Sequence, residues 1–307
     1  MKPDLYHRDR EVVFAAGLLA LGTVLAFAPD AFLPMLARAF LVQWSLVFAA
    51  FAAWAFLKRR TWPAWASALS TCMVLLQVDA PVAGPVPDLR SADLRIAQVN
   101  LLQPNTRHAE VIRLLRASDA DVISVQEVSP LWAAVLVGSL RDAYPHFKVV
   151  PDVNCYGIAL FSRRPVERMV EHALCGSPAI EAVLKGPEGP VHVFTVHATS
   201  PGDPADHRLR NTQLGRLARL VRSRGQRTIV VGDLNTVSWD RAMWTLCRAA
   251  GLRIGTSPLS PTFPAVLGFA LIPIDHVLTS SGATVVRSST FSIPGSDHRG
   301  LLADIAT

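Results

Sequence analysis

Half of the 307 residues are apolar and the mean hydropathy is positive, which is rich for a soluble enzyme of this length. There is no internal repeat and no low-complexity segment, so repeat architectures are excluded. The net charge of +6 would suit an acidic membrane surface or a nucleic acid, and it does not choose between these partners.

The apolar residues concentrate near the N-terminus, in three runs at residues 12–28, 39–57 and 62–78. Each run is close to the roughly 20 residues that a helix needs to cross the hydrocarbon core. One run alone could be a buried core helix, but three in succession predict three transmembrane helices, with residues 1–80 as a membrane anchor. For the first run a cleavable signal peptide is the alternative, which Pro29 and the acidic residues ahead of the run disfavour.

Cations flank the predicted spans unevenly. Lys2, Arg8 and Arg10 precede the first run, and three consecutive cations at residues 58–60 separate the second from the third. Because Lys and Arg near span ends stay cytoplasmic, we expect the N-terminus inside and everything after about Pro81 on the exoplasmic side.

A proline-rich linker is predicted at residues 81–90, which leaves residues 91–307 for one large domain that can bury a full core. Cys155 and Cys175 flank two strand-like runs, so a disulfide between them and a pair of buried thiols are equally good interpretations. Cys72 falls in the third apolar run, and Cys247 falls in an amphipathic segment that we expect in the core.

Short β-rich runs alternate with helical ones through this domain. Lone strands between helices, together with strands in direct succession, predict an α/β fold of mixed sheets flanked by helices. The predicted strands are 94–100, 121–128, 156–162, 180–184, 191–197, 228–235, 274–279 and 301–305. The predicted helices are 107–117, a helix opening at Ser129-Pro130, 208–224 and 238–250.

Eight polar residues stand where these strands end or begin. In layered α/β folds, side chains at strand ends can converge on a cleft while the sheet holds them rigid. The i, i+2 spacing in Gly-Asp-Leu-Asn aims two polar side chains one way and Leu234 into the core. The eight are Asn100, Glu127, His197, Asp233, Asn235, Asp275, Asp297 and His298.

Their chemistry suits hydrolysis at phosphorus. Carboxylates and an amide are oxygen ligands for a hard cation such as Mg²⁺, and a histidine beside an aspartate can polarise water or stabilise a phosphoryl group. The sequence has no serine or cysteine nucleophile motif and no zinc thiolate cluster, so we expect water to attack phosphorus. Each of the eight residues, taken alone, could have an ordinary structural role. Side-chain alternation places Glu127 on the same strand face as Ile123 and Val125. Alternation also turns His276 away from Asp275, so we expect a packing role for His276.

The ordered segments IAQVN, SVQEV, YGIALFSR, VHATSP, VVGDLN, PTFP, IDHV and SDHRGLLADI resemble those of the endonuclease/exonuclease/phosphatase superfamily. The resemblance extends from Leu94 to Ile305. It implies a DNase I-like four-layer α-β-β-α sandwich, here preceded by three transmembrane helices, and a metal-dependent phosphoester hydrolase.

The resemblance also implies a metal site. Glu127 would be the principal Mg²⁺ ligand, assisted by Asn100, and Asp297 would support the metal side. Mn²⁺ is the alternative ion.

On the substrate side, the resemblance implies that Asp233 and Asn235 position the attacking water and the phosphate. His298, oriented by Asp275, would be the acid/base or a stabiliser of the phosphoryl oxygens. His197 would hydrogen-bond the phosphate, where the AP-endonuclease branch carries a tyrosine.

With its N-terminal helices the chain is similar to a bacterial membrane branch that acts on polyprenyl diphosphate. The expected protein is therefore a multi-pass protein of the bacterial cell membrane with an exoplasmic catalytic domain and a lipid-linked substrate such as undecaprenyl diphosphate. An anchored nuclease, a phospholipid phosphodiesterase and an inactive binding module are the alternatives. Arg163, Arg164, Arg208 and Arg210 could line a polynucleotide groove or could equally hold a diphosphate, and no aromatic residues interleave with them regularly.

Overall fold

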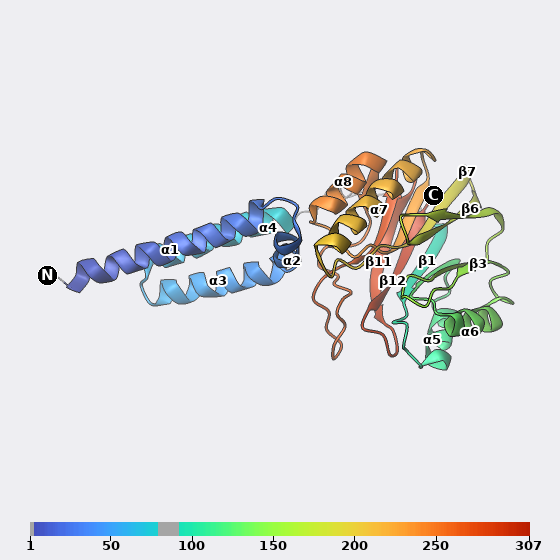
Figure 1. Ribbon diagram of the computed structural model, residues 1–307, viewed down its shortest axis with the longest axis horizontal. Coiled ribbons are helices and arrows are strands. Elements are labelled where there is room, and N and C mark those ends of the chain that lie inside the picture. The colour runs from blue at the N-terminus through green and yellow to red at the C-terminus, as the bar shows by residue number, and fades with distance from the viewer. Residues whose placement is uncertain (1–2, 79–91) are drawn as a thin grey trace. The chain divides into compact units, whose positions relative to one another are not determined.

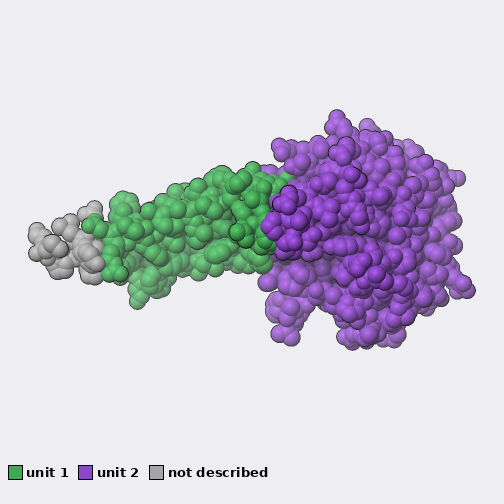
Figure 2. Space-filling model, viewed as in Figure 1, with its two compact units in different colours: residues 1–80, 239–241 green, residues 81–238, 242–307 purple. Residues whose placement is uncertain are grey.

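A computed structural model describes residues 3–78 and 92–307, so the predicted linker at 81–90 lies outside the described residues. The chain divides into two compact units (Figure 2). Unit 1 comprises residues 1–80 and 239–241, and unit 2 comprises residues 81–238 and 242–307.

Unit 1 is helical, with α1 (Pro3–Phe27), α2 (Phe32–Arg38), α3 (Leu41–Leu57) and α4 (Thr61–Val78). Helix α4 packs along both α1 and α3, and the Ser70 hydroxyl donates to the carbonyl of Leu18 at 3.1 Å. The buried Arg38 guanidinium donates to the carbonyls of Leu25 and Ala26 at 2.7 and 2.6 Å, which satisfies acceptors at the C-terminal end of α1.

All three predicted spans are helices, but their apolarity differs. Within the described residues, Asp9–Phe27 alone is long and apolar enough to cross a membrane as one helix. Helices α2 and α3 meet at a 62° bend and would make a second span only if the bent pair counts as one. Helix α4, with Ser67, Ser70 and Thr71 in its interior, does not reach that apolarity, so three transmembrane helices are not shown.

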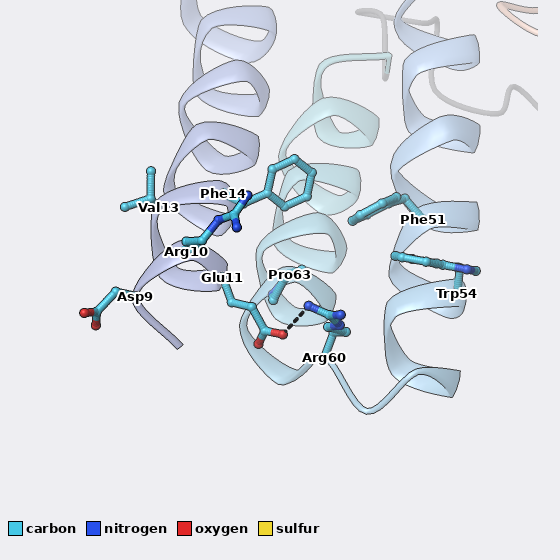
Figure 3. Close-up of a pocket in the computed structure, with 9 residues that line it drawn as sticks. All are labelled: Asp9, Arg10, Glu11, Val13, Phe14, Phe51, Trp54, Arg60 and Pro63. Carbon is cyan, nitrogen blue, oxygen red and sulfur yellow. Dashed lines mark hydrogen bonds and ion pairs between the residues drawn. The ribbon is translucent and has the colours of Figure 1, made fainter. Parts of the chain in front are cut away.

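A cleft of about 880 Å³ lies among α1, α3 and α4 (Figure 3). Glu11 and Arg60 form an ion pair of 2.6 Å at its edge, and Phe14, Phe51 and Trp54 supply aromatic walls. Within unit 1 this cleft therefore combines charged groups with an apolar lining.

Unit 2 contains two six-stranded sheets. The first has the order β11-β12-β1-β2-β4-β3, and the second has the order β5-β6-β7-β8-β10-β9. The strands of the first sheet are β1 (Leu94–Asn100), β2 (Val122–Gln126), β3 (His146–Val150), β4 (Ile158–Ser162), β11 (Thr284–Ser292) and β12 (Arg299–Ala306). Those of the second are β5 (Val166–Ala173), β6 (Pro178–Gly186), β7 (Gly189–His197), β8 (Thr228–Asp233), β9 (Leu252–Ile254) and β10 (Asp275–Ser280).

Side-chain alternation gives each sheet two buried faces. Ile96, Val193 and Val231 belong to the core between the sheets, whereas Ile123 and Val125 pack with α5 (His108–Ala117) and α6 (Pro130–Leu140). Helices α7 (Pro204–Arg222) and α8 (Arg241–Ala250) lie on the opposite side of the sandwich (Figure 1). Unit 2 is therefore the four-layer α-β-β-α sandwich that the sequence predicts.

Several features differ from the sequence predictions. Strands β3, β5, β9 and β11 were not predicted; β3, β5 and β11 are largely half-buried or exposed, so they lack a strong apolar run. Both interpretations of Cys155 and Cys175 fail, because both are free thiols, Cys155 is exposed and Cys175 is half-buried. Cys247 is buried in α8, as expected.

Candidate active site

Strand register brings the ends of five strands together. In the first sheet β1 runs parallel to β2, so that Asn100 lies opposite Gln126. In the second sheet β8 is central: Asp233 lies opposite His197 of the parallel strand β7 and opposite Asp275 of the antiparallel strand β10. The polar residues that end these strands therefore cluster at one edge of the sandwich, as predicted.

A hydrogen-bonded Asp275–His298 pair forms the floor of the site. The Nδ1 atom of His298 lies 2.9 Å from Oδ2 of Asp275, and both side chains are almost fully buried. Burial opposes the charged imidazolium, but the Asp275 carboxylate outweighs it and raises the pKa of His298 to about 10. The same attraction, against burial, lowers the pKa of Asp275. His298 is thus an oriented cation at neutral pH.

Asp233 has the opposite electrostatic environment. Its carboxylate is buried, and burial together with repulsion from Asp275 raises its pKa to about 7, although His298 opposes this. Its Oδ2 atom lies 3.8 Å from Nε2 of His298 and 3.6 Å from Nε2 of His197. A carboxylate with a pKa near neutrality can accept a proton from water and release it again.

Asn100 links two of the carboxylates of the site. Its Nδ2 atom donates to Oε1 of Glu127 and to Oδ2 of Asp233, each at 3.1 Å. Strand β2 ends at Gln126, and Glu127 takes a left-handed backbone conformation with φ of 60°. Alternation was therefore the wrong reason for placing Glu127: the backbone turn directs it to Asn100, away from the face of Ile123 and Val125 that packs on helices.

The remaining predicted residues lie around this centre with different contacts. His197 is buried, and burial and then repulsion from His298 lower its pKa to about 4, so it is neutral. Asn235 follows the end of β8 in a left-handed conformation, and its Nδ2 atom donates to the carbonyl of Ala198 at 2.9 Å. The strand geometry behind the predicted i, i+2 alignment does not extend to Asn235, because β8 ends at Asp233; the Asn235 N–H donates to Oδ1 of Asp233 at 2.9 Å. His276 bonds the Thr236 carbonyl at 2.8 Å, in the packing role expected for it.

Sequence reasoning missed a supporting shell of uncharged groups. Gln98 donates from Nε2 to Asp275 at 2.6 Å and to Gln126 at 2.8 Å, with both glutamines fully buried. The Thr262 hydroxyl accepts from the backbone N–H of Asp275 at 3.3 Å, and the Phe263 ring lies 4.8 Å from the His298 ring. The available signal was one glutamine in each of two mostly apolar strands, β1 and β2, since a buried amide requires polar partners.

The residues present fit a divalent cation. Among the described residues, the ligand atoms of Asp233, Asp275 and His298 lie within 4.8 Å of one another. Oδ1 of Asp275 accepts from Gln98 and Oδ2 is paired with His298, which orients the histidine. The two oxygens of Glu127 likewise accept from Asn100 and from the Gln103 N–H, so hydrogen bonding alone does not choose between these carboxylates as ligands. Glu127 is partly exposed beside Asn100, and Oδ1 of Asp297 is buried with no hydrogen-bond partner among the described residues, as a metal-ligand oxygen would be.

A sequence profile described as "Endonuclease/Exonuclease/phosphatase family" matches residues 97–298, two thirds of the chain. The chain belongs to this family. It is accordingly a metal-dependent phosphoester hydrolase, and the matched range contains every predicted site residue from Asn100 to His298. No curated protein matches the chain.

Solved structures of family members share the fold. An endonuclease/exonuclease/phosphatase from Beutenbergia cavernae DSM 12333 is 18% identical with a TM-score of 0.56, and the match covers 71% of this chain and 72% of that one. The family member from Bacteroides vulgatus is 18% identical with a TM-score of 0.59, covering 69% and 98%. D. rerio TDP2 complexed with single strand DNA product is 17% identical with a TM-score of 0.58, covering 70% and 99%. At these identities the likeness concerns the fold of unit 2.

Proposed function

We propose that this family member is a Mg²⁺-dependent hydrolase of a lipid-linked phosphate, with undecaprenyl diphosphate as the substrate to test, and that Mn²⁺ can replace Mg²⁺. The proposed protein is a multi-pass protein of the bacterial cell membrane in which residues 1–80 are the anchor, 81–90 the linker and 91–307 the exoplasmic catalytic domain. The observation that carries the chemistry is the convergence of Asn100, Glu127, Asp233 and the Asp275–His298 pair at one end of the sandwich.

Glu127 and Asn100, with Asp297 beside them, would hold the cation, which supplies positive charge to the phosphate oxygens when it is bound. Asp233, with a pKa of about 7, would take a proton from the water that attacks phosphorus. The new bond joins the water oxygen to phosphorus, and the bond from phosphorus to the leaving oxygen breaks.

The cationic His298 would donate a hydrogen bond to a phosphoryl oxygen or a proton to the leaving oxygen. Asp275 holds Nδ1 of His298, which leaves Nε2 of His298 facing the site. The neutral His197 would hydrogen-bond the phosphate from the β7 side. Asn235, held by the Ala198 carbonyl, would direct its amide oxygen to the water or phosphate.

Two observations favour a lipid over a polynucleotide. The N-terminal helix Asp9–Phe27 is a candidate membrane span. Three of the arginines considered for a polynucleotide groove already have partners in the chain: Arg163 and Arg164 form surface ion pairs with Asp119 and Asp121, and the fully buried Arg210 binds the Asn235 carbonyl.

The test is phosphate release from undecaprenyl diphosphate by the detergent-purified full chain, with Mg²⁺, with Mn²⁺ and with EDTA. Release that requires the metal and is lost in His298→Ala and in Glu127→Gln would support the proposal. If the wild-type chain binds Mg²⁺ but releases no phosphate, the polyprenyl substrate is wrong. A phospholipid diester and single-stranded DNA are the next substrates, the latter because a structural neighbour was crystallised with DNA product.

A further inference from the structure

An apolar hairpin borders the candidate active site. Residues 263–272, with the sequence FPAVLGFALI, contain no polar or charged side chain. Antiparallel bridges join Phe263 to Ile272 and Val266 to Phe269, so the segment folds back on itself, and it projects beyond the strand ends as a narrow loop (Figure 1). We call residues 263–272 the apolar hairpin.

The tip of the apolar hairpin is strongly exposed. The exposed fraction is 93% for Leu267, 77% for Phe269, 59% for Val266 and 47% for Leu271. Single exposed apolar residues are ordinary on a soluble protein, but a contiguous exposed apolar patch marks a binding surface. Four such residues within six positions form this patch.

The turn at the tip makes the exposure more informative. Leu267 has φ of 50° and Gly268 has φ of 85°, which is the pattern of a two-residue hairpin turn with both central residues left-handed. Asn-Gly or Asp-Gly is the usual pair there, because the left-handed conformation costs other residues about 1–2 kcal/mol. Leucine at this position therefore has an unfavourable backbone conformation. In water its exposed side chain is also unfavourably hydrated, and that second cost disappears if the side chain leaves water.

Hydrogen bonds join the base of the apolar hairpin to the segment that contains Asp297 and His298. The Ala265 N–H donates to the Asp297 carbonyl at 2.6 Å, and the Arg299 N–H donates to the Thr262 carbonyl at 2.8 Å. The Arg299 guanidinium donates to the Gly268 carbonyl at 3.2 Å, near the tip. Since Phe263 also lies against His298, the tip has a defined position relative to the catalytic histidine.

We propose that the apolar hairpin inserts its tip into the acyl-chain region of a lipid bilayer and docks unit 2 on the membrane at the active-site entrance. The tip residues extend over roughly 5–10 Å of hairpin, which matches the depth of interfacial insertion. The Arg299 guanidinium lies beside the turn, on the Gly268 carbonyl, and a side chain of this length can reach lipid phosphates while the apolar side chains insert. The inference rests on the proposed membrane location of the chain and not on which phosphate it hydrolyses.

Insertion depth provides the first test. The full chain would carry Cys72→Ala, Cys155→Ser and Cys175→Ser, a single cysteine in place of Leu267, and an environment-sensitive NBD label. In vesicles of phosphatidylcholine and phosphatidylglycerol, we expect a blue-shifted emission that lipids brominated on the acyl chain quench. The matched control is a label in place of Leu131, which is 61% exposed on α6 of the outer helix layer, and it should behave as in water.

Equal emission and equal absence of quenching at the two positions would overturn the proposal. Carbonate extraction of the same vesicles tests the proposed anchor separately. If carbonate extracts the chain although its label at position 267 was quenched, the hairpin inference stands and the proposed anchor is wrong.

A pair of variants separates docking from folding. Leu267→Asn creates the preferred Asn-Gly turn, so the melting temperature should stay the same or rise. Combined with Phe269→Asp, it should lower hydrolysis of a vesicle-borne substrate at least about tenfold while hydrolysis of a soluble aryl phosphodiester is unchanged. The Leu131→Asp control should leave both rates unchanged. Equal loss on both substrates would mean that the hairpin shapes the site and does not dock the membrane.

Discussion

The buried carboxylate of Glu181 offers a stability test that requires no knowledge of the substrate. It lies on β6 with no exposed side-chain surface. Arg224 donates to both of its oxygens at 2.7 and 2.9 Å, and His192 and His172 each bond one oxygen at 2.7 Å. Burial would raise the pKa of Glu181, but the hydrogen bonds from Arg224, His192 and His172 outweigh burial and lower it to about 2.

The size of the effect follows from this pKa. A change from the usual 4.5 to about 2 corresponds to about 3 kcal/mol of folding free energy at pH 7. Because Arg224 is 26% exposed and solvent screens its charge, we take about 2–3 kcal/mol for Glu181→Gln. In a unit of this size that is a drop in melting temperature of roughly 4–12 °C.

The pH dependence has a defined sign. A lowered carboxyl pKa stabilises the folded state fully above the unfolded value of 4.5, and this stabilisation is lost as the pH falls through about 2. The loss of unfolding free energy caused by Glu181→Gln should therefore be largest at pH 7 and about half as large at pH 3. Thermal unfolding of the detergent-solubilised chain, followed by circular dichroism at both pH values, measures it.

The matched control is Glu171→Gln on β5, whose ion pair with Lys148 is 3.4 Å long and about half exposed, and which should cost below about 1 kcal/mol. A Glu181→Gln deficit that is as large at pH 3 as at pH 7 would refute the electrostatic account. It would attribute the stabilisation to packing and neutral hydrogen bonds instead.

Four further predictions concern the active site, the backbone and the thiols. Asp275→Asn should lower turnover by about 10²–10⁴-fold and also lower the melting temperature, since it removes the buried carboxylate that orients and pairs with His298; an unchanged rate would exclude that role. Mg²⁺ at about 100 times its dissociation constant should stabilise the wild-type chain by about 2.7 kcal/mol in calorimetry but not Glu127→Gln, and equal stabilisation of both would place the metal elsewhere. Gly232→Ala should prevent folding, because φ is 148° and the added Cβ would overlap the Val196 carbonyl, whereas Gly138→Ala in α6 meets open space and should fold, as measured by soluble yield. Maleimide should label the exposed Cys155 in the native, unreduced chain, although more slowly than an ordinary surface thiol because burial and the nearby Glu127 raise its pKa; the buried Cys247, whose pKa burial raises to about 12, should stay unlabelled, and mass spectrometry would detect a contrary pattern.

The sequence predicts the buried strands well because their signal is local. Strand β1 has the predicted bounds, and β8 and β10 are shifted by no more than two residues at either end, since runs of Val and Ile between helices leave little choice. Helix α6 begins as expected, with the Ser129 hydroxyl accepting from the Trp132 N–H at 3.2 Å. Exposed strands such as β5 escape prediction because pairing with a neighbouring strand, and not their own composition, makes them strands.

The transmembrane prediction goes further than the structure supports. Apolar runs of the right length predicted three spans, and all three runs do form helices. The bend between α2 and α3 is visible only in the structure, whereas the hydroxyl-bearing residues of α4 are visible in the sequence and lower its apolarity below that of a membrane span. Length and apolarity therefore establish a helix more securely than they establish its environment.

The contacts of the active site depend on backbone turns that periodicity does not report. Glu127 and Asn235 both follow the last residue of a strand and both have positive φ, which turns each side chain away from the direction that alternation gives it. Leu267 at the tip of the apolar hairpin has the same kind of backbone and the greatest exposure of any described large apolar residue. Non-glycine residues hold this conformation at a cost, so it persists where the position of the side chain matters more than local stability. The proposed chemistry would explain the first two positions, and contact with lipid would explain the third.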